Sequence, residues 1–305
     1  MVRDYDIETN VLRRLFAFFV VIQCATAQTY TGSRACSGCH AEIYKSFAKS
    51  AMGRSMSLPG SMEAVLEKPV TIYNTKLDRY FEVFRKDGDL YQSEYALEGE
   101  TRTFENTQKL DFVMGAGENG WTFLVRRGES LVEAPLTLYA KPRKWDLSPG
   151  FEREDVGFNR PIHEACIACH SGRANAVPGR NGLYGSPPFH ELAVGCENCH
   201  GPGSLHVAGR KASIVNPGRL APRLAEDICM NCHQGGNARV LQPGKTYSDF
   251  RPGTPLHQTL AIFKLPRARD ADLLEHNAAM KLSKCFRGSN GKLSCLTCHS
   301  VHAAL

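Results

Sequence analysis

Cys36-Ser-Gly-Cys39-His40 is the first of five pentapeptides in which two cysteines, separated by two residues, are followed directly by a histidine. The pattern recurs as Cys166-Ile-Ala-Cys169-His170, Cys196-Glu-Asn-Cys199-His200, Cys229-Met-Asn-Cys232-His233 and Cys295-Leu-Thr-Cys298-His299. A chain of this composition would contain roughly 0.02 such pentapeptides by chance. Five copies therefore reflect a chemical requirement around which the rest of the chain is organised.

The pattern C-x-x-C-H is the signature of covalent haem attachment. The two thiols add across the vinyl groups of one haem, and the adjacent histidine becomes the proximal ligand of its iron. Ten of the twelve cysteines belong to these motifs. Zinc ribbons are a weaker interpretation because they pair their knuckles and need no histidine after each one. Disulfide frameworks are usual in much shorter chains. The sequence therefore predicts five covalently attached haems c.

The bulk composition fits a folded protein and argues against nucleic-acid binding. The 305 residues suffice for one large domain or two ordinary ones. A content of 42% hydrophobic and 22% charged residues does not indicate disorder. The formal charge of +6 omits the haem propionates, which would shift the total to about −4 if all were ionised. No basic run is interleaved with aromatic residues in the manner of nucleic-acid-binding proteins.

Residues 1–27 are predicted to be a cleaved signal peptide. Arg13 and Arg14 precede an apolar run over residues 15–22, and Ala25-Thr-Ala27 forms an A-x-A cleavage pattern. The run is too short to span a bilayer, so no transmembrane span should remain after cleavage. A lipoprotein signal at Cys24 and an uncleaved N-terminal anchor are the alternatives. A periplasmic or extracellular location agrees with covalent haem, which is attached outside the cytoplasm, and leaves membrane association open.

The spacing of cysteine and histidine divides the mature chain into three segments. Residues 28–61 hold the first motif, residues 161–305 hold the other four, and residues 62–160 contain neither residue type. Hairpin turns are predicted in this middle segment at Lys86-Asp-Gly-Asp89 and Arg127-Gly-Glu-Ser130. The segment is therefore a predicted β-rich insertion forming a small antiparallel sheet, with strands near residues 70–74, 80–85, 90–97, 109–114, 122–127 and 131–135.

Frequent glycine and proline in the four-haem segment argue against long helices there. Short helices are predicted at residues 41–50, 224–232 and 270–284. Porphyrin faces can supply the apolar core that longer elements would otherwise provide. The predicted fold class is therefore α+β with little regular secondary structure: a haem-packed fold of short helices and loops with an antiparallel β insertion.

Six histidines lie outside the motifs and are candidates for the second axial position of the irons. His302 follows His299 by three residues, a rise of about 4.5 Å in a helix, so it cannot reach around the porphyrin disc of the same haem. The same argument makes His206, after Gly201-Pro-Gly203, a ligand to a neighbouring haem. Such cross-ligation forces haems close together. The full set is His163, His190, His206, His257, His276 and His302.

The other candidates differ in their settings. His163 lies two helical turns before His170 and should also point at a neighbouring haem. His276 lies within a predicted helix, which is a suitable ligand position. His190 and His257 lie in proline-rich loops, where a histidine is usually just solvated, and His257 is the weakest candidate.

The first motif has no spare histidine between His40 and His163. Met52 is the predicted distal ligand of its haem, and methionine in that position raises the reduction potential relative to two histidines. The alternative is that Met52 and Met56 fill gaps in the core. Cys285 remains as a thiol outside the motifs, and it could be buried and inert, a thiolate haem ligand or a link to a partner.

Two longer stretches resemble the multihaem cytochromes c related to cytochrome c-554, a tetrahaem carrier of nitrifying bacteria. They are Gly195-Cys-Glu-Asn-Cys-His-Gly-Pro-Gly-Ser-Leu-His206 and Cys295-Leu-Thr-Cys-His-Ser-Val-His302. In that group the first motif is often followed by an aromatic residue, two residues, serine, one residue and histidine. Phe47-Ala-Lys-Ser50-Ala-Met52 fits this pattern with methionine in place of histidine, so the resemblance also favours Met52. The segment from Gly115 to Gly150 resembles the β insertion of larger members.

These observations favour an electron carrier. Seven candidate ligands for five distal positions could leave every iron six-coordinate and closed to substrate. The redox partners would be proteins or a membrane quinol-oxidising complex. One alternative is an oxidoreductase of the nitrite or hydroxylamine type, which needs one open iron and nearby acid–base groups. The other is a haem subunit of a larger respiratory or extracellular electron-transfer complex, docked through residues 62–160.

Overall fold

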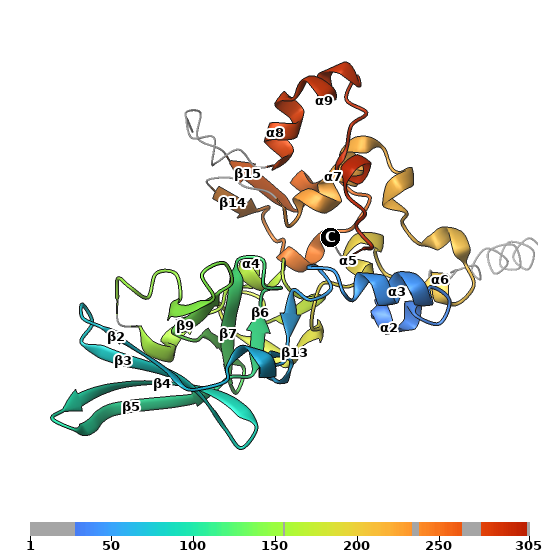
Figure 1. Cartoon of the computed structure of the whole chain (residues 1–305). Helices are drawn as coiled ribbons and strands as arrows, with labels where there is room; N and C mark the ends of the chain where they lie inside the picture. Colours follow the sequence, from blue (N-terminus) through green and yellow to red (C-terminus); the bar gives the residue numbers. More distant parts are fainter. Residues whose placement is uncertain (1–27, 155, 234–237, 264–275, 304–305) are drawn as a thin grey trace, which may run out of the picture.

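The computed structural model describes residues 28–154, 156–233, 238–263 and 276–303. The predicted signal peptide, with its alternatives at the N-terminus, therefore lies outside the described residues, as do residues 270–275 of the predicted C-terminal helix. The sheets of the β-rich region form one part of the molecule and the motif-bearing short helices form another (Figure 1). The helices that carry the first motif lie with the later motifs rather than with the sheets.

The first sheet is a four-stranded antiparallel meander at one end of the molecule (Figure 1). The predicted hairpin at its centre is confirmed, because Lys86 pairs with Asp89 and the two turn residues both have positive φ, as a type I′ turn requires. The fourth strand is absent from the sequence prediction because it is an exposed edge strand without apolar alternation. The strands are β2 (Val70–Asn74), β3 (Arg79–Lys86), β4 (Asp89–Glu98) and β5 (Thr101–Lys109).

The two faces of this sheet carry different side chains. Phe81 on β3 is buried in the core. On the opposite face Tyr73, Tyr80 and Tyr95 form a row with ring centroids 4.6 and 5.3 Å apart. The Arg102 guanidinium lies 3.9 Å from the centre of the Tyr95 ring and helps to cover it. Because neighbouring residues of a strand point to opposite faces, this division fixes the register of the sheet.

A second sheet of seven strands connects the first sheet to the haem-motif region. The predicted turn at Arg127–Ser130 is confirmed by the pairing of those two residues. The sequence predicts one small sheet in this region, and the region forms two, because Leu110-Asp111 separates strands that belong to different sheets. The strands are β1 (Met56–Ser57), β6 (Phe112–Met114), β7 (Gly120–Arg127), β8 (Ser130–Glu133), β9 (Leu136–Tyr139), β10 (Lys144–Leu147) and β11 (Arg160–Pro161).

The apolar core is concentrated in the β-rich region. One cluster there has 17 buried residues and includes Phe123 and Trp145, whose rings stack at 5.2 Å. A second cluster joins the seven-stranded sheet to the second motif through Met56, Ile167 and others. The cluster confined to the haem-motif region has four buried residues, so the described part of that region has little apolar core of its own. Met56 is thus a core residue.

The haem-motif region consists of short helices, single turns and two small hairpins. The longest described helix there has nine residues, in agreement with the glycine and proline content. The helices are α2 (Ser33–Cys36), α3 (Ala41–Phe47), α4 (Glu164–Ile167), α5 (Cys196–His200), α6 (Ser204–Val207), α7 (Pro222–Met230), α8 (His276–Leu282), α9 (Lys284–Gly288) and α10 (Cys295–Cys298). The hairpins are β12 (Arg173–Ala176) with β13 (Tyr184–Glu191), and β14 (Ala238–Leu241) with β15 (Leu260–Phe263). The 3-10 turns are η1 (Pro59–Val65), η2 (Gly157–Asn159), η3 (Lys211–Ser213), η4 (Pro217–Arg219), η5 (Tyr247–Asp249) and η6 (Leu256–Gln258).

The predicted C-terminal helix is divided at Ser283 in its described part. The Ser283 side chain accepts a hydrogen bond from the Phe286 backbone N–H at 3.0 Å and so begins a new helix, α9. Over the residues that the structure describes, no helix combines the length and apolarity needed to cross a membrane.

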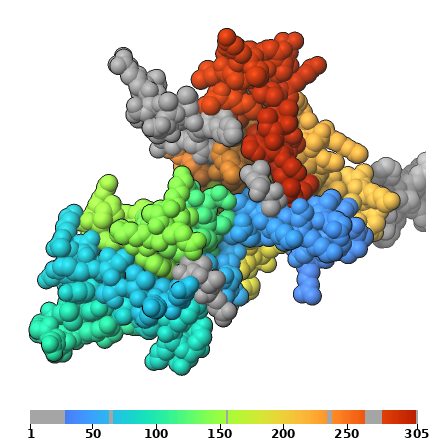
Figure 2. Space-filling model, viewed as in Figure 1, coloured from blue at the N-terminus to red at the C-terminus, as the bar shows by residue number. Residues whose placement is uncertain are grey.

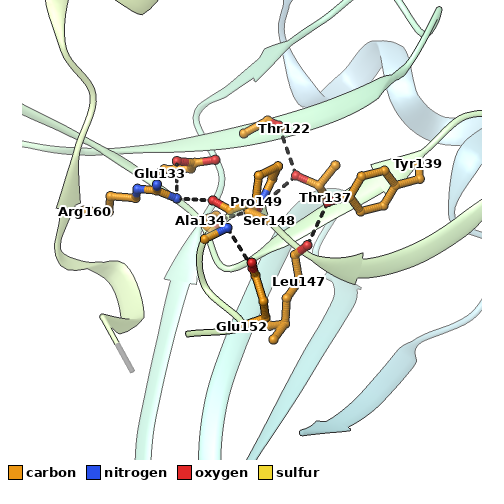
Figure 3. Close-up of polar contacts among 11 residues, drawn as sticks. Thr122, Glu133, Ala134, Thr137, Tyr139, Leu147, Ser148, Pro149, Glu152 and Arg160 are labelled. Carbon is orange, nitrogen blue, oxygen red and sulfur yellow. Dashed lines mark hydrogen bonds and ion pairs between the residues drawn. The ribbon is translucent and has the colours of Figure 1, made fainter. Parts of the chain in front are cut away.

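A chain of buried hydroxyl groups links β7, β9 and the strand end at Ser148 (Figure 3). The Thr122 and Thr137 hydroxyls lie 3.0 Å apart, and the Thr137 and Ser148 hydroxyls lie 2.8 Å apart. The Ser148 hydroxyl donates to the Ala134 carbonyl at 2.9 Å. Each of these three hydroxyls thus has a partner, as burial favours. The network holds β9 and β10 against β7, and so shapes the side of the sheet that carries Glu133.

Glu133 provides a pH-dependent prediction for the same region (Figure 3). Burial raises the pKa of the Glu133 carboxyl, and Arg160, at 3.4 Å, partly opposes that rise. A raised pKa in the folded state means that folding binds the proton more tightly. The contribution of Glu133 to stability is therefore present below the carboxyl pKa of the unfolded chain, about 4.3, and is lost as pH rises through the folded-state pKa.

We expect Glu133→Gln to be more stable than the parent protein at neutral pH and equal to it near pH 3, because glutamine carries no charge to bury. The measurement is the midpoint of urea unfolding as a function of pH. Glu152→Gln is the matched control, because Glu152 is exposed and hydrogen bonds from backbone N–H groups lower the pKa of its carboxyl. A neutral-pH gain that Glu152→Gln reproduces would contradict the assignment to burial of Glu133.

Candidate haem-binding site

Each motif forms a single tight turn that places its cysteines and histidine close together. In the first, fourth and fifth motifs the backbone N–H of the histidine donates to the backbone carbonyl of the first cysteine, at 2.8 to 2.9 Å. In the third motif, α5 covers the whole pentapeptide from Cys196 to His200. In the second motif the His170 N–H donates to Ile167 instead, at 3.0 Å. A helical turn of this kind presents two thiols and one imidazole to the same side, as covalent haem attachment requires.

The first motif is attached to the third motif through a buried carboxylate. Glu197, the second residue of the third motif, is 5% exposed. Its carboxylate accepts hydrogen bonds from the backbone N–H groups of Thr31 at 3.0 Å, Gly32 at 2.7 Å and Gly203 at 2.7 Å. The Ser33 hydroxyl also accepts from the Cys196 N–H at 2.8 Å. These contacts fix the chain just before Cys36 against the third motif.

The cysteines of different motifs approach one another in pairs. Cys36 lies close to Cys196, Cys169 to Cys232, and Cys229 to Cys295. Cys199 of the third motif lies close enough to raise the pKa of Cys229 and of Cys232. The five motifs therefore form one contiguous group. The first motif thus lies beside the third, although residues 62–160 separate it from the other four motifs in the sequence.

Arg239 supplies positive charge at the contact between the second and fourth motifs. Its guanidinium lies 3.7 Å from the Cys169 sulfur and donates to the Asn231 carbonyl at 3.0 Å. The hydrogen bond with Cys232, together with Arg239, lowers the pKa of the Cys169 thiol to about 6. Burial instead raises the pKa of Cys229 and Cys36 to about 12.

Two pairs of histidines from different parts of the chain lie ring to ring. His40 and His206 have ring centroids 6.4 Å apart with planes inclined by 13°. His200 and His302 have centroids 6.0 Å apart with planes inclined by 12°. Two imidazoles on opposite faces of one iron have centres about 6 Å apart, because two metal–nitrogen bonds of about 2.0 Å join the nearer edges of the rings. The spacing thus fits a metal ion held between each pair.

Hydrogen bonds orient one ring of each pair. The His200 Nδ1 lies 2.8 Å from the Val215 carbonyl, and the His206 Nδ1 lies 3.2 Å from the Lys211 carbonyl. A proton held on Nδ1 by a carbonyl leaves Nε2 free to bind a metal, and such outer contacts are usual around ligand histidines. Burial and the proximity of His200 lower the pKa of His302, which favours the neutral ring that coordination requires. The residues present therefore fit haem.

The remaining predicted ligands stand in varied positions. His163 is exposed and begins α4, with its Nε2 3.5 Å from the Asn181 amide. His276 begins α8. His190 lies on strand β13 with an exposed side chain, so its prediction as a loop residue is wrong. The reason is that Pro187 and Pro188 lie within that edge strand and do not end it.

The other candidates named from the sequence are Met52, His257 and Cys285. Met52 is partly buried in the turn after α3. His257 is exposed on η6. Cys285 is exposed on α9, so a buried, inert thiol is not what the structure shows.

Sequence reasoning did not single out Glu197 or Arg239. Glu197 occupies a variable position of its motif, and a carboxylate there signals nothing until residues 31–32 are seen beside it. Arg239 lies on β14, seven residues after Cys232, in a stretch without any motif. Similarly, the spacing predicts that His206 serves another haem, but no feature of the sequence says which one. Only the tertiary structure places these groups.

Comparisons with known proteins agree with the chemistry of the motifs. The family model described as cytochrome c554 and c-prime matches residues 151–201, which contain the second and third motifs. The C-type polyheme cytochromes OmcB from two strains of Geobacter sulfurreducens are each 24% identical to the chain over 150 residues. This match covers 44% of the chain and 19% of each relative, so the chain spans only a small part of their length.

One solved structure also resembles the chain. It is the crystal structure of the outer cell wall cytochrome OcwA, with a TM-score of 0.49 and 14% sequence identity. The similarity covers 76% of the chain and 44% of that protein.

Proposed function

Because the chain is a multihaem c-type cytochrome, we propose that it is an exported electron carrier with five haems c. The ten motif cysteines hold the haems through thioether bonds. The motif histidines His40, His170, His200, His233 and His299 are the proximal ligands. Each haem, when bound, supplies an iron that changes between the ferric and ferrous states by one electron. The donor and acceptor are redox proteins or a membrane quinol-oxidising complex, met in the periplasm or outside the cell.

The two histidine pairs support specific distal ligands. We assign His206 opposite His40 on the first haem, and His302 opposite His200 on the third, from the ring separations of 6.4 and 6.0 Å. His206 takes the position that the sequence suggested for Met52. His163, His190 and His276 remain the candidates for the second, fourth and fifth haems.

The paired cysteines support an order of haems in space. The first motif touches the third through Cys36 and Cys196, and the third lies beside the fourth. The second and fifth motifs each touch the fourth, through Cys169 and Cys295. His302 further connects the fifth motif to the third. In this order the first haem is at one end of the array. Residues 28–61 and 161–305 hold the haems, and residues 62–160 support them.

The single observation that supports the carrier function is that two pairs of histidine rings, His40 with His206 and His200 with His302, have the separation expected for two ligands of one iron. An iron with imidazole on both faces has no open position for a substrate, which an oxidoreductase of the nitrite or hydroxylamine type would need. In this proposal two of the five irons are closed in this way, and the ring separations support it. The contacts between the motifs then bring the haems close to one another and do not open one of them to a substrate.

The test is haem content combined with electron paramagnetic resonance of the purified, oxidised protein. We expect five haems per chain by the pyridine haemochrome method, and low-spin ferric signals alone. The signals should not change when cyanide or nitrite is added. Fewer than five haems would contradict the stoichiometry. A high-spin signal that shifts with nitrite would contradict the carrier and favour the enzyme.

A further inference from the structure

We propose that the surface around the first haem is the docking face for an acidic redox protein, so that electrons enter or leave the array there. The inference rests on the proposed electron-transfer function and adds the partner's chemistry and its place of contact. We call this surface the basic face. It is formed by Arg34, Lys45, Lys49, Arg54, Arg210 and Lys211, all of which are exposed.

Two chain segments far apart in sequence come together to form the basic face. His40 immediately precedes α3, and His206 lies on α6, and the two rings are 6.4 Å apart. Lys45 lies in the last turn of α3. The backbone carbonyl of Lys211 lies 3.2 Å from Nδ1 of the His206 ring. Helices α2, α3 and α6 accordingly adjoin at one end of the molecule, away from the four-stranded sheet (Figures 1 and 2). The positive charges thus lie on the segments that carry His40 and His206, the two histidines assigned to the first haem.

The charge distribution of the chain is strongly uneven. Residues 28–61 and 204–223, which build this end, contain eight lysines and arginines and one acidic residue, Glu42. Residues 62–160 contain 14 basic and 18 acidic residues. Among the described residues of the basic face, only Lys45 has an ion-pair partner, Glu42 at 3.0 Å. Both members of that pair are largely exposed, so it neutralises little. Two propionates of the first haem would leave this end net positive. A negatively charged partner is therefore steered to it.

Exposed apolar side chains lie on the same two helices, α3 and α6. Ile43, three residues after His40, is 46% exposed, and Val207, directly after His206, is 55% exposed. Small apolar groups enclosed by charges allow two proteins to touch closely without binding permanently, and weak redox encounters have small interfaces of this kind. A partner seated here would bring its redox centre next to the first haem.

The shape of the surface favours a protein over a lipid membrane. Helices that lie in a membrane interface present a long apolar face, whereas α3 has seven residues and α6 has four. Two exposed apolar side chains would anchor the chain weakly in lipid. The first haem also lies at one end of the proposed order, where it can exchange electrons with a partner.

The test compares two triple variants of the holoprotein with the parent. Lys45→Glu, Lys49→Glu and Arg210→Glu together reverse the basic face. Lys68→Glu, Lys86→Glu and Lys141→Glu reverse the same number of exposed charges in the β-rich region. The reduced proteins are oxidised in a stopped-flow instrument by anionic hexacyanoferrate(III) or by cationic tris(phenanthroline)cobalt(III), at several ionic strengths.

We expect the reversed basic face to react with hexacyanoferrate about tenfold more slowly at low salt, and with the cobalt complex faster. The difference should vanish at high salt, and the control variant should match the parent. Poly-L-glutamate, a probe for an acidic protein surface, should slow the parent and not the reversed variant. Equal hexacyanoferrate rates in the parent and the reversed variant would overturn the proposal.

The membrane is tested separately with phosphatidylcholine vesicles that contain phosphatidylglycerol. Sedimentation of the parent with these vesicles, lost in the reversed variant and unaffected by poly-L-glutamate, would overturn the assignment of a protein partner. No sedimentation supports it. Haem content and low-spin resonance signals report on the proposed function by themselves. If they match in all three proteins while the rates do not change, the docking face is wrong and the carrier function stands.

Discussion

Replacing Glu197 with alanine is expected to destabilise the protein by about 3 to 5 kcal/mol, because three backbone N–H groups would lose a charged acceptor in the interior. The carboxylate is 5% exposed and accepts from Thr31, Gly32 and Gly203 at 2.7 to 3.0 Å. Hydrogen bonds to a charged group are stronger than those between neutral groups, and unpaired buried donors are costly. The loss should separate the first haem-binding segment from the third motif before the rest of the molecule unfolds.

The measurement is urea unfolding of the holoprotein, followed by circular dichroism and by haem absorbance. Glu42→Ala is the matched control, since Glu42 is exposed on α3 and its removal should change stability by less than about 0.5 kcal/mol. Glu197→Gln provides a milder variant, because its amide oxygen can still accept while its NH2 group faces backbone donors. If Glu197→Ala is no less stable than Glu42→Ala, the hydrogen bonds of Glu197 do not hold the first and third motifs together.

Replacing His206 with alanine is expected to convert one haem from low spin to high spin, because His206 is the ring opposite His40. The pair has centroids 6.4 Å apart and nearly parallel planes, and the Lys211 carbonyl orients the His206 ring. Removing one axial ligand leaves the iron with an open position that water or an added ligand can occupy. Electron paramagnetic resonance of the oxidised protein should show one new high-spin signal that shifts with cyanide.

Met52→Ala distinguishes the two assignments for the first haem. With His206 as ligand, this variant keeps all signals low spin and leaves the redox titration unchanged. With Met52 as ligand, it would remove the highest-potential step, and His206→Ala would then have no effect on spin state. His302→Ala should behave as His206→Ala does, at the third haem. His257→Ala is the control, since His257 is exposed on η6 and is assigned no haem.

Much of the β-rich region could be predicted from its residues. The turn Lys86-Asp-Gly-Asp89 has residues that tolerate positive φ between two apolar-alternating runs, so local chemistry alone fixes that hairpin. Strand β5 gives no such signal, because it is an exposed edge held by pairing with β4. The division into two sheets at Leu110-Asp111 has no local marker either, since it depends on which partner each strand finds.

In the candidate site, too, some elements could be predicted from the sequence and others could not. Helices α3 and α7 were predicted to within a few residues because each joins directly to a motif. The break at Ser283 was not predicted, although serine at that position is a usual helix start. His190 was misplaced because two prolines suggested a loop, while β13 accepts them as an edge strand.

By itself the sequence determined the chemistry of this protein, because the C-x-x-C-H turn is local and carries the thiols and the histidine within five residues. It also predicted that His206 and His302 do not serve the haem of their own motif, since the chain between them and the motif histidine is so short. Only the tertiary structure decided which motif histidine each one lies beside, that Glu197 attaches the first motif to the third, and that exposed lysines and arginines gather on the segments that carry His40 and His206. Those outcomes join residues more than 100 positions apart, and no short-range rule relates such residues before the chain has folded.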